Sequence, residues 1–151
     1  MGIKRPNISE CHWRYFYDED FYTTRLSFPS MFGPGNAPEG CSSLQVEIYF
    51  SDKYKSLNRP AEDFIPIIRD EMIKCGILRV NDEILFQNAW ISPYAQIIFD
   101  HERKEAVELL HAFLLDNNIH FGGRFAEWAY TWSDESYLAG NNAAEDIIKT
   151  M

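Results

Sequence analysis

Polar and apolar residues alternate over the first third of the chain, which is the pattern of strands with two unlike faces. Residues 13–17 carry tryptophan or tyrosine at every second position, residues 23–28 form an extended run, and residues 44–50 alternate apolar side chains with more polar ones. Glycine and proline concentrate in residues 29–40, between the second and third runs, and break regular structure there. The pattern predicts three strands and a surface loop.

The spacing of apolar residues predicts a helix within residues 60–76. Phe64, Ile68 and Met72 recur at four-residue intervals, so they share one helical face. A proline opens this segment and a glycine closes it, as is common for helices. Pro66 lacks a backbone donor, so the sequence also allows a kink in the first turn or a later start.

The rest of the chain predicts two further helices separated by extended segments. Residues 84–99 are predicted as two extended pieces, and Asp100 is expected to cap a helix that ends at residues 117–118. Residues 119–132 are predicted as strand and loop, and residues 138–150 as a final helix. Because the predicted strands come in neighbouring runs, we expect an α+β fold whose sheet is mostly antiparallel or mixed and is flanked by about three helices.

Composition limits the classes of function. The 151 residues are enough for one domain, expected to span residues 1–151. A net charge of -9 without a basic stripe argues against nucleic acid and anionic membranes as partners. No run of 18 apolar residues predicts a membrane span, and residues 1–14 lack the apolar core of a signal peptide, so we expect a cytoplasmic location.

Metal and hydrolase chemistry find little support. The three cysteines are far apart and odd in number, and the four histidines have no zinc-ligand spacing with them. The acidic run at residues 18–20 is interpreted as a charged turn, and no serine stands in a nucleophile elbow. We therefore expect no metal site.

The segment around residues 122–130 has the most informative chemistry. Its paired glycines allow close approach of the backbone to a ligand, and Arg124 follows them directly as a partner for phosphate oxygens. A helix starting near residues 140–142 would present free N–H groups to an electron-rich oxygen. Taken alone, a glycine pair is more often an ordinary turn or bulge, so both interpretations stay open.

The pattern Gly-Arg-Phe-Ala-x-Trp-x-Tyr, followed by Asp134, resembles the C-terminal flavin segment of UDP-galactopyranose mutases. It also resembles the related flavin-containing amine oxidase and protoporphyrinogen oxidase group. The resemblance implies that Gly123 and Arg124 contact the flavin and that the arginine lies close to the diphosphate of a sugar nucleotide. It further implies that Asp134, Gly140 and Asn141 lie beside the flavin.

Two other stretches carry the same resemblance. Residues 21–30, the Pro-Glu-Gly loop that follows, and Glu47 look like the substrate-domain strands of the family, which implies that Arg25 faces the diphosphate. Tyr94 takes the place of a family Tyr-x-Tyr-Pro strand and is implied as a substrate contact, although Gln96 departs from that motif.

The resemblance extends from about Tyr15 to Ile148, without the Gly-x-Gly-x-x-Gly turn that grips the FAD pyrophosphate. It implies the fold of the C-terminal domain of FAD-linked reductases. We expect the substrate-binding half of a flavin-dependent oxidoreductase or mutase of sugar-nucleotide, lipopolysaccharide or polysaccharide biosynthesis, incomplete alone. FAD is expected only where a separately encoded partner supplies the dinucleotide-binding domain.

The alternative is a non-catalytic binding or assembly module, self-associated as a homo-oligomer through its aromatic face. The aromatic residues expected to line the pocket are Tyr15, Tyr17, Trp128 and Tyr130.

Overall fold

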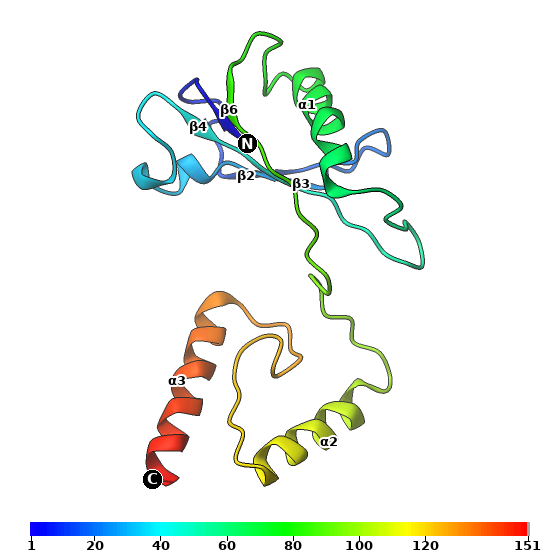
Figure 1. The fold of residues 1–151 in the computed structure, drawn as a ribbon, viewed down its shortest axis with the longest axis vertical. Helices are drawn as coiled ribbons and strands as arrows, with labels where there is room; N and C mark the ends of the chain where they lie inside the picture. Colours follow the sequence, from blue (N-terminus) through cyan, green and yellow to red (C-terminus); the bar gives the residue numbers. More distant parts are fainter. Residues whose placement is uncertain (151) are drawn as a thin grey trace. The chain divides into compact units, whose positions relative to one another are not determined.

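The computed structural model describes residues 1–150, which form two compact units. The first unit is Met1–Ile91, and the second begins at Ser92. The colours of Figure 1 run from blue to green in the first unit and from green to red in the second. The expectation that residues 1–151 make a single domain stays a prediction.

A three-stranded antiparallel sheet in the order β2-β3-β5 lies in the first unit. Its strands are β2 (Trp13–Tyr15), β3 (Arg25–Ser27) and β5 (Gln45–Glu47), and they come from the three predicted runs. Arg25 lies opposite Tyr15 on one side and Glu47 on the other. Because paired residues share a face, these polar and aromatic groups gather on one face of the sheet. Leu26 and Val46 lie on the opposite face and belong to the core or pack against it.

A second antiparallel sheet, in the order β4-β1-β6, lies in the same unit. Its strands are β1 (Gly2–Ile3), β4 (Ser42–Ser43) and β6 (Ile84–Phe86). Strands of two residues have no readable periodicity, so β1 and β4 went unpredicted. Strand β6 opens the predicted extended segment at residues 84–99. With helices and antiparallel sheets in one chain, the α+β prediction is confirmed.

Helix α1 (Phe64–Lys74) packs one face into the core of the first unit. The predicted stripe of Phe64, Ile68 and Met72 is buried. The helix starts at Phe64, later than Pro60. Pro66 is therefore its third residue, in the first turn, where backbone N–H groups have no partner within the helix, so the proline costs no hydrogen bond. The core residues that surround the stripe are Ile3, Leu26, Phe28, Leu44, Ile77 and Leu78.

A buried carboxylate ties α1 to the segment that leads into β3. Glu71 accepts hydrogen bonds from the backbone N–H of Tyr22 at 2.6 Å and of Thr23 at 3.1 Å, and from the Thr23 hydroxyl at 2.6 Å. Burying a carboxylate costs little only when such donors satisfy it. The contact therefore fixes the start of β3, two residues before Arg25.

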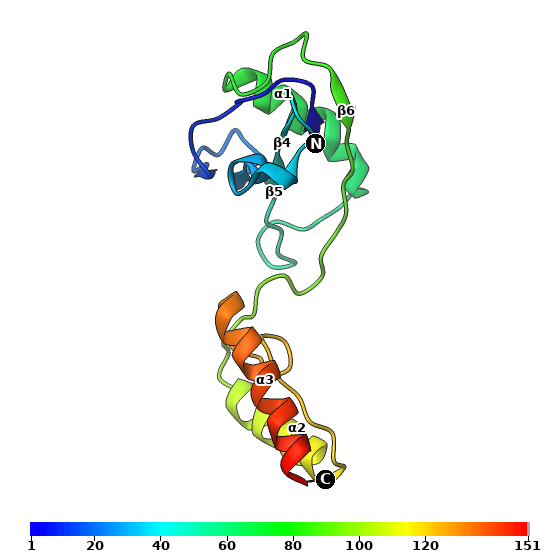
Figure 2. The ribbon, with the colours of Figure 1, turned by 90° about the vertical axis from the view of Figure 1, so that its left-hand side faces the viewer.

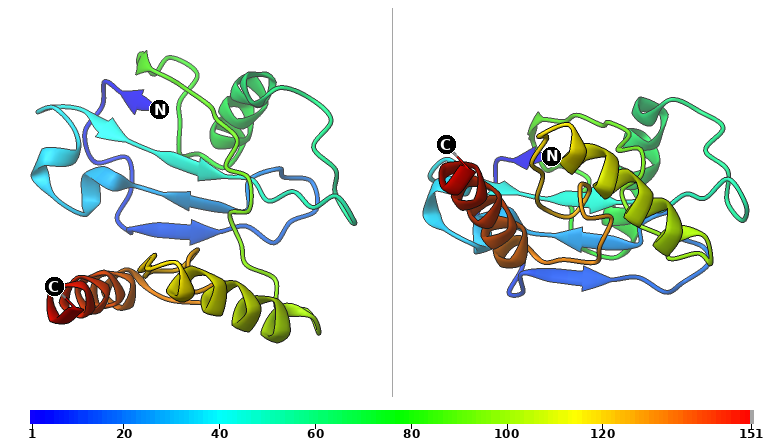
Figure 3. Two further views of the ribbon diagram at one scale, coloured as in Figure 1. Left: turned by 60° about the horizontal axis from the view of Figure 1, so that its bottom comes forward. Right: turned by 90° about the horizontal axis from the view of Figure 1, so that it is seen from below.

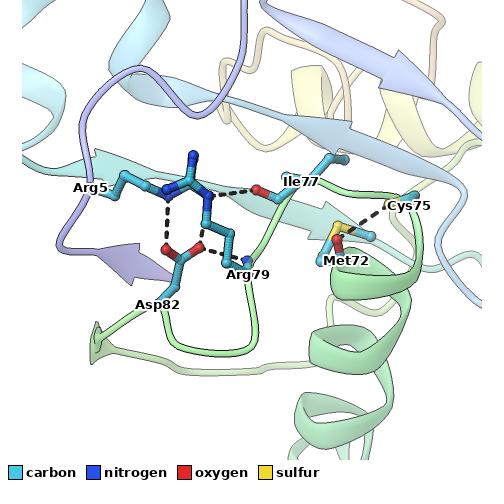
Figure 4. Close-up of polar contacts among 6 residues, drawn as sticks. All are labelled: Arg5, Met72, Cys75, Ile77, Arg79 and Asp82. Atoms are coloured by element: carbon cyan, nitrogen blue, oxygen red, sulfur yellow. Dashed lines mark hydrogen bonds and ion pairs between the residues drawn. The ribbon is translucent and has the colours of Figure 1, made fainter.

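A bidentate ion pair joins the N-terminal segment to the loop after α1 (Figure 4). Arg5 Nε donates to Asp82 Oδ1 at 2.8 Å, and Arg5 Nη2 donates to Asp82 Oδ2 at 2.7 Å and to the Ile77 carbonyl at 2.8 Å. The Arg79 backbone N–H also donates to Asp82 at 2.8 Å. These bonds, the one from Arg5 above all, hold the pKa of Asp82 below its usual value.

The second unit contains α2 (Arg103–Asp116) and α3 (Ser133–Thr150). Residues 117–132 join the two helices and have no strand, so the strand predicted at 119–132 is wrong (Figures 1 and 2). Backbone hydrogen bonds from Glu127 to Gly123 and from Ala129 to Arg124 make turns there instead, at 2.9 and 3.1 Å. Turns of this kind form within a few residues and leave no alternating pattern.

Both helices of this unit begin at other residues than predicted. Figure 3 draws α2 in yellow-green and α3 in orange to red. The residue that precedes α2 is Glu102, not Asp100. Helix α3 begins at Ser133, five residues before the predicted start at Leu138. The reason is local: the Glu135 carboxylate reaches back to accept the Trp132 backbone N–H at 2.7 Å, as in a capping box. Among the helices of residues 1–150, none is long and apolar enough to cross a membrane.

Candidate functional site

Arg25, the first predicted anion contact, is already paired with an acid. Its Nη2 donates to Glu47 Oε1 at 2.5 Å across the β3–β5 pairing. The side chains of Arg25 and Glu47 are 39% and 22% exposed. The hydrogen bond to Glu47 is the largest cause of the raised pKa of Arg25. The site therefore offers a guanidinium whose charge is largely balanced by its own neighbour.

Aromatic side chains surround this pair on the same sheet. The Tyr49 hydroxyl donates to Glu47 Oε2 at 3.1 Å, and burial, followed by the Glu47 charge, raises the pKa of Tyr49. Tyr15, opposite Arg25, is half exposed. Trp13 stacks with Phe32 at 6.2 Å between ring centroids. Flat aromatic faces beside charged groups suit a ring-shaped ligand that carries polar substituents.

Arg124, the second predicted anion contact, has a different environment in the second unit. Its guanidinium lies over the ring of Tyr130, 4.8 Å from the centroid, and Nη2 donates to Gln96 Oε1 at 3.3 Å. Gln96 in turn donates to the Tyr130 hydroxyl. Within the described part of the chain, no acidic side chain forms an ion pair with Arg124.

One donor of Arg124 also lacks a partner. Its Nε is buried and makes no hydrogen bond to any described residue. A cation held by a tyrosine face and a neutral amide keeps its full charge, and a buried donor without an acceptor is costly. The Nε of Arg25 is buried without a partner as well, so the difference between the two arginines is the Glu47 ion pair, which balances the charge of Arg25 and has no counterpart at Arg124.

The glycine pair before Arg124 serves the fold of this unit. A Cβ on Gly122 would come within 2.6 Å of the Ala139 carbonyl oxygen, so this backbone lies directly against α3. Gly123 has a φ of 92°, a left-handed value that favours glycine. Its N–H donates to Glu127 Oε1 at 3.3 Å. The backbone of Gly122 thus lies close to helix α3 and not to a ligand. The N–H of Gly123 is already bonded to the Glu127 carboxylate.

The helix N-terminus predicted near residues 140–142 is wrong, whereas contact of Asp134, Gly140 and Asn141 with a flavin stays a prediction. Gly140 and Asn141 lie in the middle of α3, so the free N–H groups expected there do not exist, and Asn141 donates to Glu145 Oε1 at 3.0 Å. The true first turn carries Asp134 and Glu135. Acidic residues stabilise a helix N-terminus and oppose an anionic or electron-rich ligand at the same place.

Tyr94 lies near the Arg124 cluster in sequence and has an unusual backbone. Its φ is 54° and the residue is 77% exposed. The residue of this segment that contacts Arg124 is Gln96. In the sequence, Gln96 stands out only because it departs from the Tyr-x-Tyr-Pro motif. Whether Tyr94 contacts a substrate stays a prediction.

The second unit also has two hollows. One, of about 550 Å³, lies between residues 115–131 and α3, and the other, of about 350 Å³, lies between α2 and residues 125–128. Arg124 lines neither of them. In residues 1–150, no group of three or more histidine, cysteine or acidic side chains is arranged to hold a metal ion.

The structure thus brings Gly123 and Arg124 together with Gln96 and Tyr130 in the second unit, and pairs Arg25 with Glu47 in the first. Glu47 had a sequence signal, since it stands in the alternating run of a neighbouring strand. Gln96 had none, because it is 28 residues from Arg124.

Fold and sites together define an α+β protein with small antiparallel sheets and two separately built arginine sites. No protein-family model matches the sequence, and no curated protein matches it. The fold is similar to that of a solved structure of reduced UDP-galactopyranose mutase, with a TM-score of 0.80 and 23% sequence identity. The match covers 99% of this chain and 32% of the mutase chain, so this chain spans about a third of that protein's length. It has a mutase-like fold.

Proposed function

We propose that this chain is the sugar-nucleotide-facing part of a flavin-dependent, mutase-like protein, and that Arg124 binds the diphosphate. The observation that carries the proposal is the uncompensated charge of Arg124 on a fold shared with a UDP-galactopyranose mutase. The sugar and its place in polysaccharide or lipopolysaccharide biosynthesis belong to the same proposal.

The chemistry expected of Arg124 is electrostatic. The Tyr130 ring holds the guanidinium plane from one side, and Gln96 occupies Nη2, which leaves other N–H groups for phosphate oxygens. Neutralising a departing diphosphate lowers the barrier to its release. Arg25 is the weaker candidate for binding a phosphate, because the phosphate has to compete with Glu47 for the same guanidinium.

FAD would be held mainly by a dinucleotide-binding domain supplied by a partner, and when bound it would supply redox and nucleophilic chemistry that these side chains lack. The residues of this chain fit the cofactor only in part. Arg124 has an unpartnered buried donor, whereas the N–H of Gly123 is already taken by Glu127. The backbone N–H groups of Gly140 and Asn141 are not free, because both residues lie inside α3. The part of this chain in flavin binding is therefore assigned to Arg124.

The test is a titration with UDP and with uridine, which differ only by the diphosphate. UDP should bind more tightly than uridine, and Arg124→Ala should weaken UDP by about tenfold while uridine stays unchanged, since one charge-assisted contact is lost. Arg59→Ala is the matched control, because Arg59 lies over the Phe64 ring in the first unit. Equal affinity of the wild-type protein for UDP and uridine would contradict the proposal.

A second candidate is a non-catalytic assembly module. It is favoured by the self-neutralised Arg25–Glu47 pair and by large exposed apolar side chains on α2, such as Leu109 and Phe113. Exposed apolar surface of this kind promotes association. A homo-oligomer by light scattering that becomes monomeric in Trp128→Ala, together with no UDP binding, would select this candidate.

A further inference from the structure

Two aromatic residues with left-handed backbones flank the Arg124 cluster. Tyr94 has a φ of 54° and Trp128 a φ of 46°. Bulky residues rarely adopt this conformation, and it persists only where the surroundings enforce it. Each stands two residues before a side chain that contacts Arg124: Tyr94 before Gln96, and Trp128 before Tyr130.

Helix α2 supplies the groups that hold Trp128. Arg103 donates to the Trp128 carbonyl from Nε at 2.8 Å and also from Nη2. The Arg103 guanidinium lies over the Phe99 ring, 4.2 Å from its centroid, which fixes the donor in place. Two N–H groups that converge on one carbonyl restrain its direction more tightly than a single bond would.

A second side chain of α2 holds the same segment two residues earlier. His111 Nε2 donates to the Ala126 carbonyl at 2.9 Å, and its ring lies 4.2 Å from that of Phe121 between centroids. The carbonyls of residues 126 and 128 are thus both anchored to α2. These anchors restrain the backbone of residues 126–128, which lies between Arg124 and Tyr130.

We infer that Arg103 and Trp128 are positioning residues: Arg103 locks Trp128 in its left-handed conformation, and this turn places the Tyr130 ring under the Arg124 guanidinium. The inference rests on the proposed function for its consequence, which is the affinity of Arg124 for a diphosphate. The positioning role itself can be tested without a ligand, because the buried Nε–H of Arg124 responds to the geometry of the cluster.

The test compares two substitutions at one position in the full chain. Glycine adopts positive φ without steric cost, whereas a β-branched residue does not. Both Trp128→Gly and Trp128→Val remove the same ring. The NMR resonance of the Arg124 Nε–H should therefore keep its shift and slow exchange in the glycine variant and lose them in the valine variant. The same signal in both folded variants would overturn the inference.

Arg103→Ala gives the independent arm, with Lys104→Ala as its control, because Lys104 is 85% exposed on the same helix. Arg103→Ala should perturb the Arg124 resonance and weaken UDP by about tenfold, the worth of one charge-assisted hydrogen bond, and added guanidinium should restore part of both. An unchanged Arg124 signal in folded Arg103→Ala would refute the positioning role. A perturbed signal in a protein that never binds UDP would support the positioning role and reject the diphosphate function alone.

Discussion

Arg25 and Glu47 lie opposite each other in the β3–β5 pairing and form an ion pair 2.5 Å long on the face of the sheet that also carries Tyr15. The arginine that the sequence assigns to an anionic ligand therefore has an anion of its own. Any phosphate that binds Arg25 has to displace this carboxylate or share the guanidinium with it.

Glu47→Gln should raise the affinity of the first unit for phosphate-bearing ligands. The amide leaves the Arg25 charge uncompensated, so UDP binding should tighten several-fold if Arg25 takes part, while stability falls by less than about 1 kcal/mol, as expected for a partly exposed pair. Calorimetric titration and urea unfolding measure the two effects. Adding Arg25→Ala to Glu47→Gln should cancel the gain in affinity; a gain that survives would assign it to another group.

The same substitution should also change the titration of Tyr49. Burial is the largest cause of the raised pKa of Tyr49, and the Glu47 charge is the next. Glu47→Gln should therefore lower the pKa of Tyr49 part of the way toward its ordinary value, as followed by ultraviolet absorbance during alkaline titration. An unchanged titration would show that burial alone sets it.

Asp82 should make the protein sensitive to acid. Because Arg5 lowers the pKa of Asp82 in the folded state, the ion pair stabilises the fold above the unfolded pKa of about 3.9. That stability is lost as the pH falls through the lower, folded pKa. Asp82→Asn should cost about 3 kcal/mol at pH 7, since it leaves Arg5 partly buried without its partner, and should flatten the decline of stability between about pH 5 and pH 2.

Urea unfolding across this pH range provides the measurement. Glu83→Gln is the control, because the Glu83 pair with Lys4 is well exposed and should contribute almost nothing. Equal acid sensitivity of the wild type and Asp82→Asn would contradict the assignment.

Gly122 and Gly140 should respond in opposite ways to alanine. A Cβ on Gly122 would collide with the Ala139 carbonyl, so Gly122→Ala should destabilise the protein by about 1–3 kcal/mol. Gly140 has open space around its added Cβ and lies inside α3, so Gly140→Ala should stabilise by up to about 1 kcal/mol. Thermal unfolding of the two variants checks both signs, and destabilisation by Gly140→Ala would argue against a continuous α3.

What the sequence determined by itself is the set of elements whose signals are local. The four-residue spacing of Phe64, Ile68 and Met72 specifies α1 and its buried face, because one helical turn brings these positions together. The alternating runs specify β2, β3 and β5, and with them the face that carries Arg25. The α+β class follows from the order of these elements.

The tertiary structure decided the partners. Gln96 and Arg124 are 28 residues apart, and Arg5 and Asp82 are 77 apart, so no pattern along the chain relates them. The predicted start of α3 is wrong because Gly140 resembles a helix boundary in the sequence. The helix begins at Ser133, where the Glu135 carboxylate caps it by accepting the Trp132 N–H. Local spacing fixes which face of an element a side chain occupies. Which charge it meets there depends on how distant segments pack, and that packing is what leaves Arg124 uncompensated and gives Arg25 its own carboxylate.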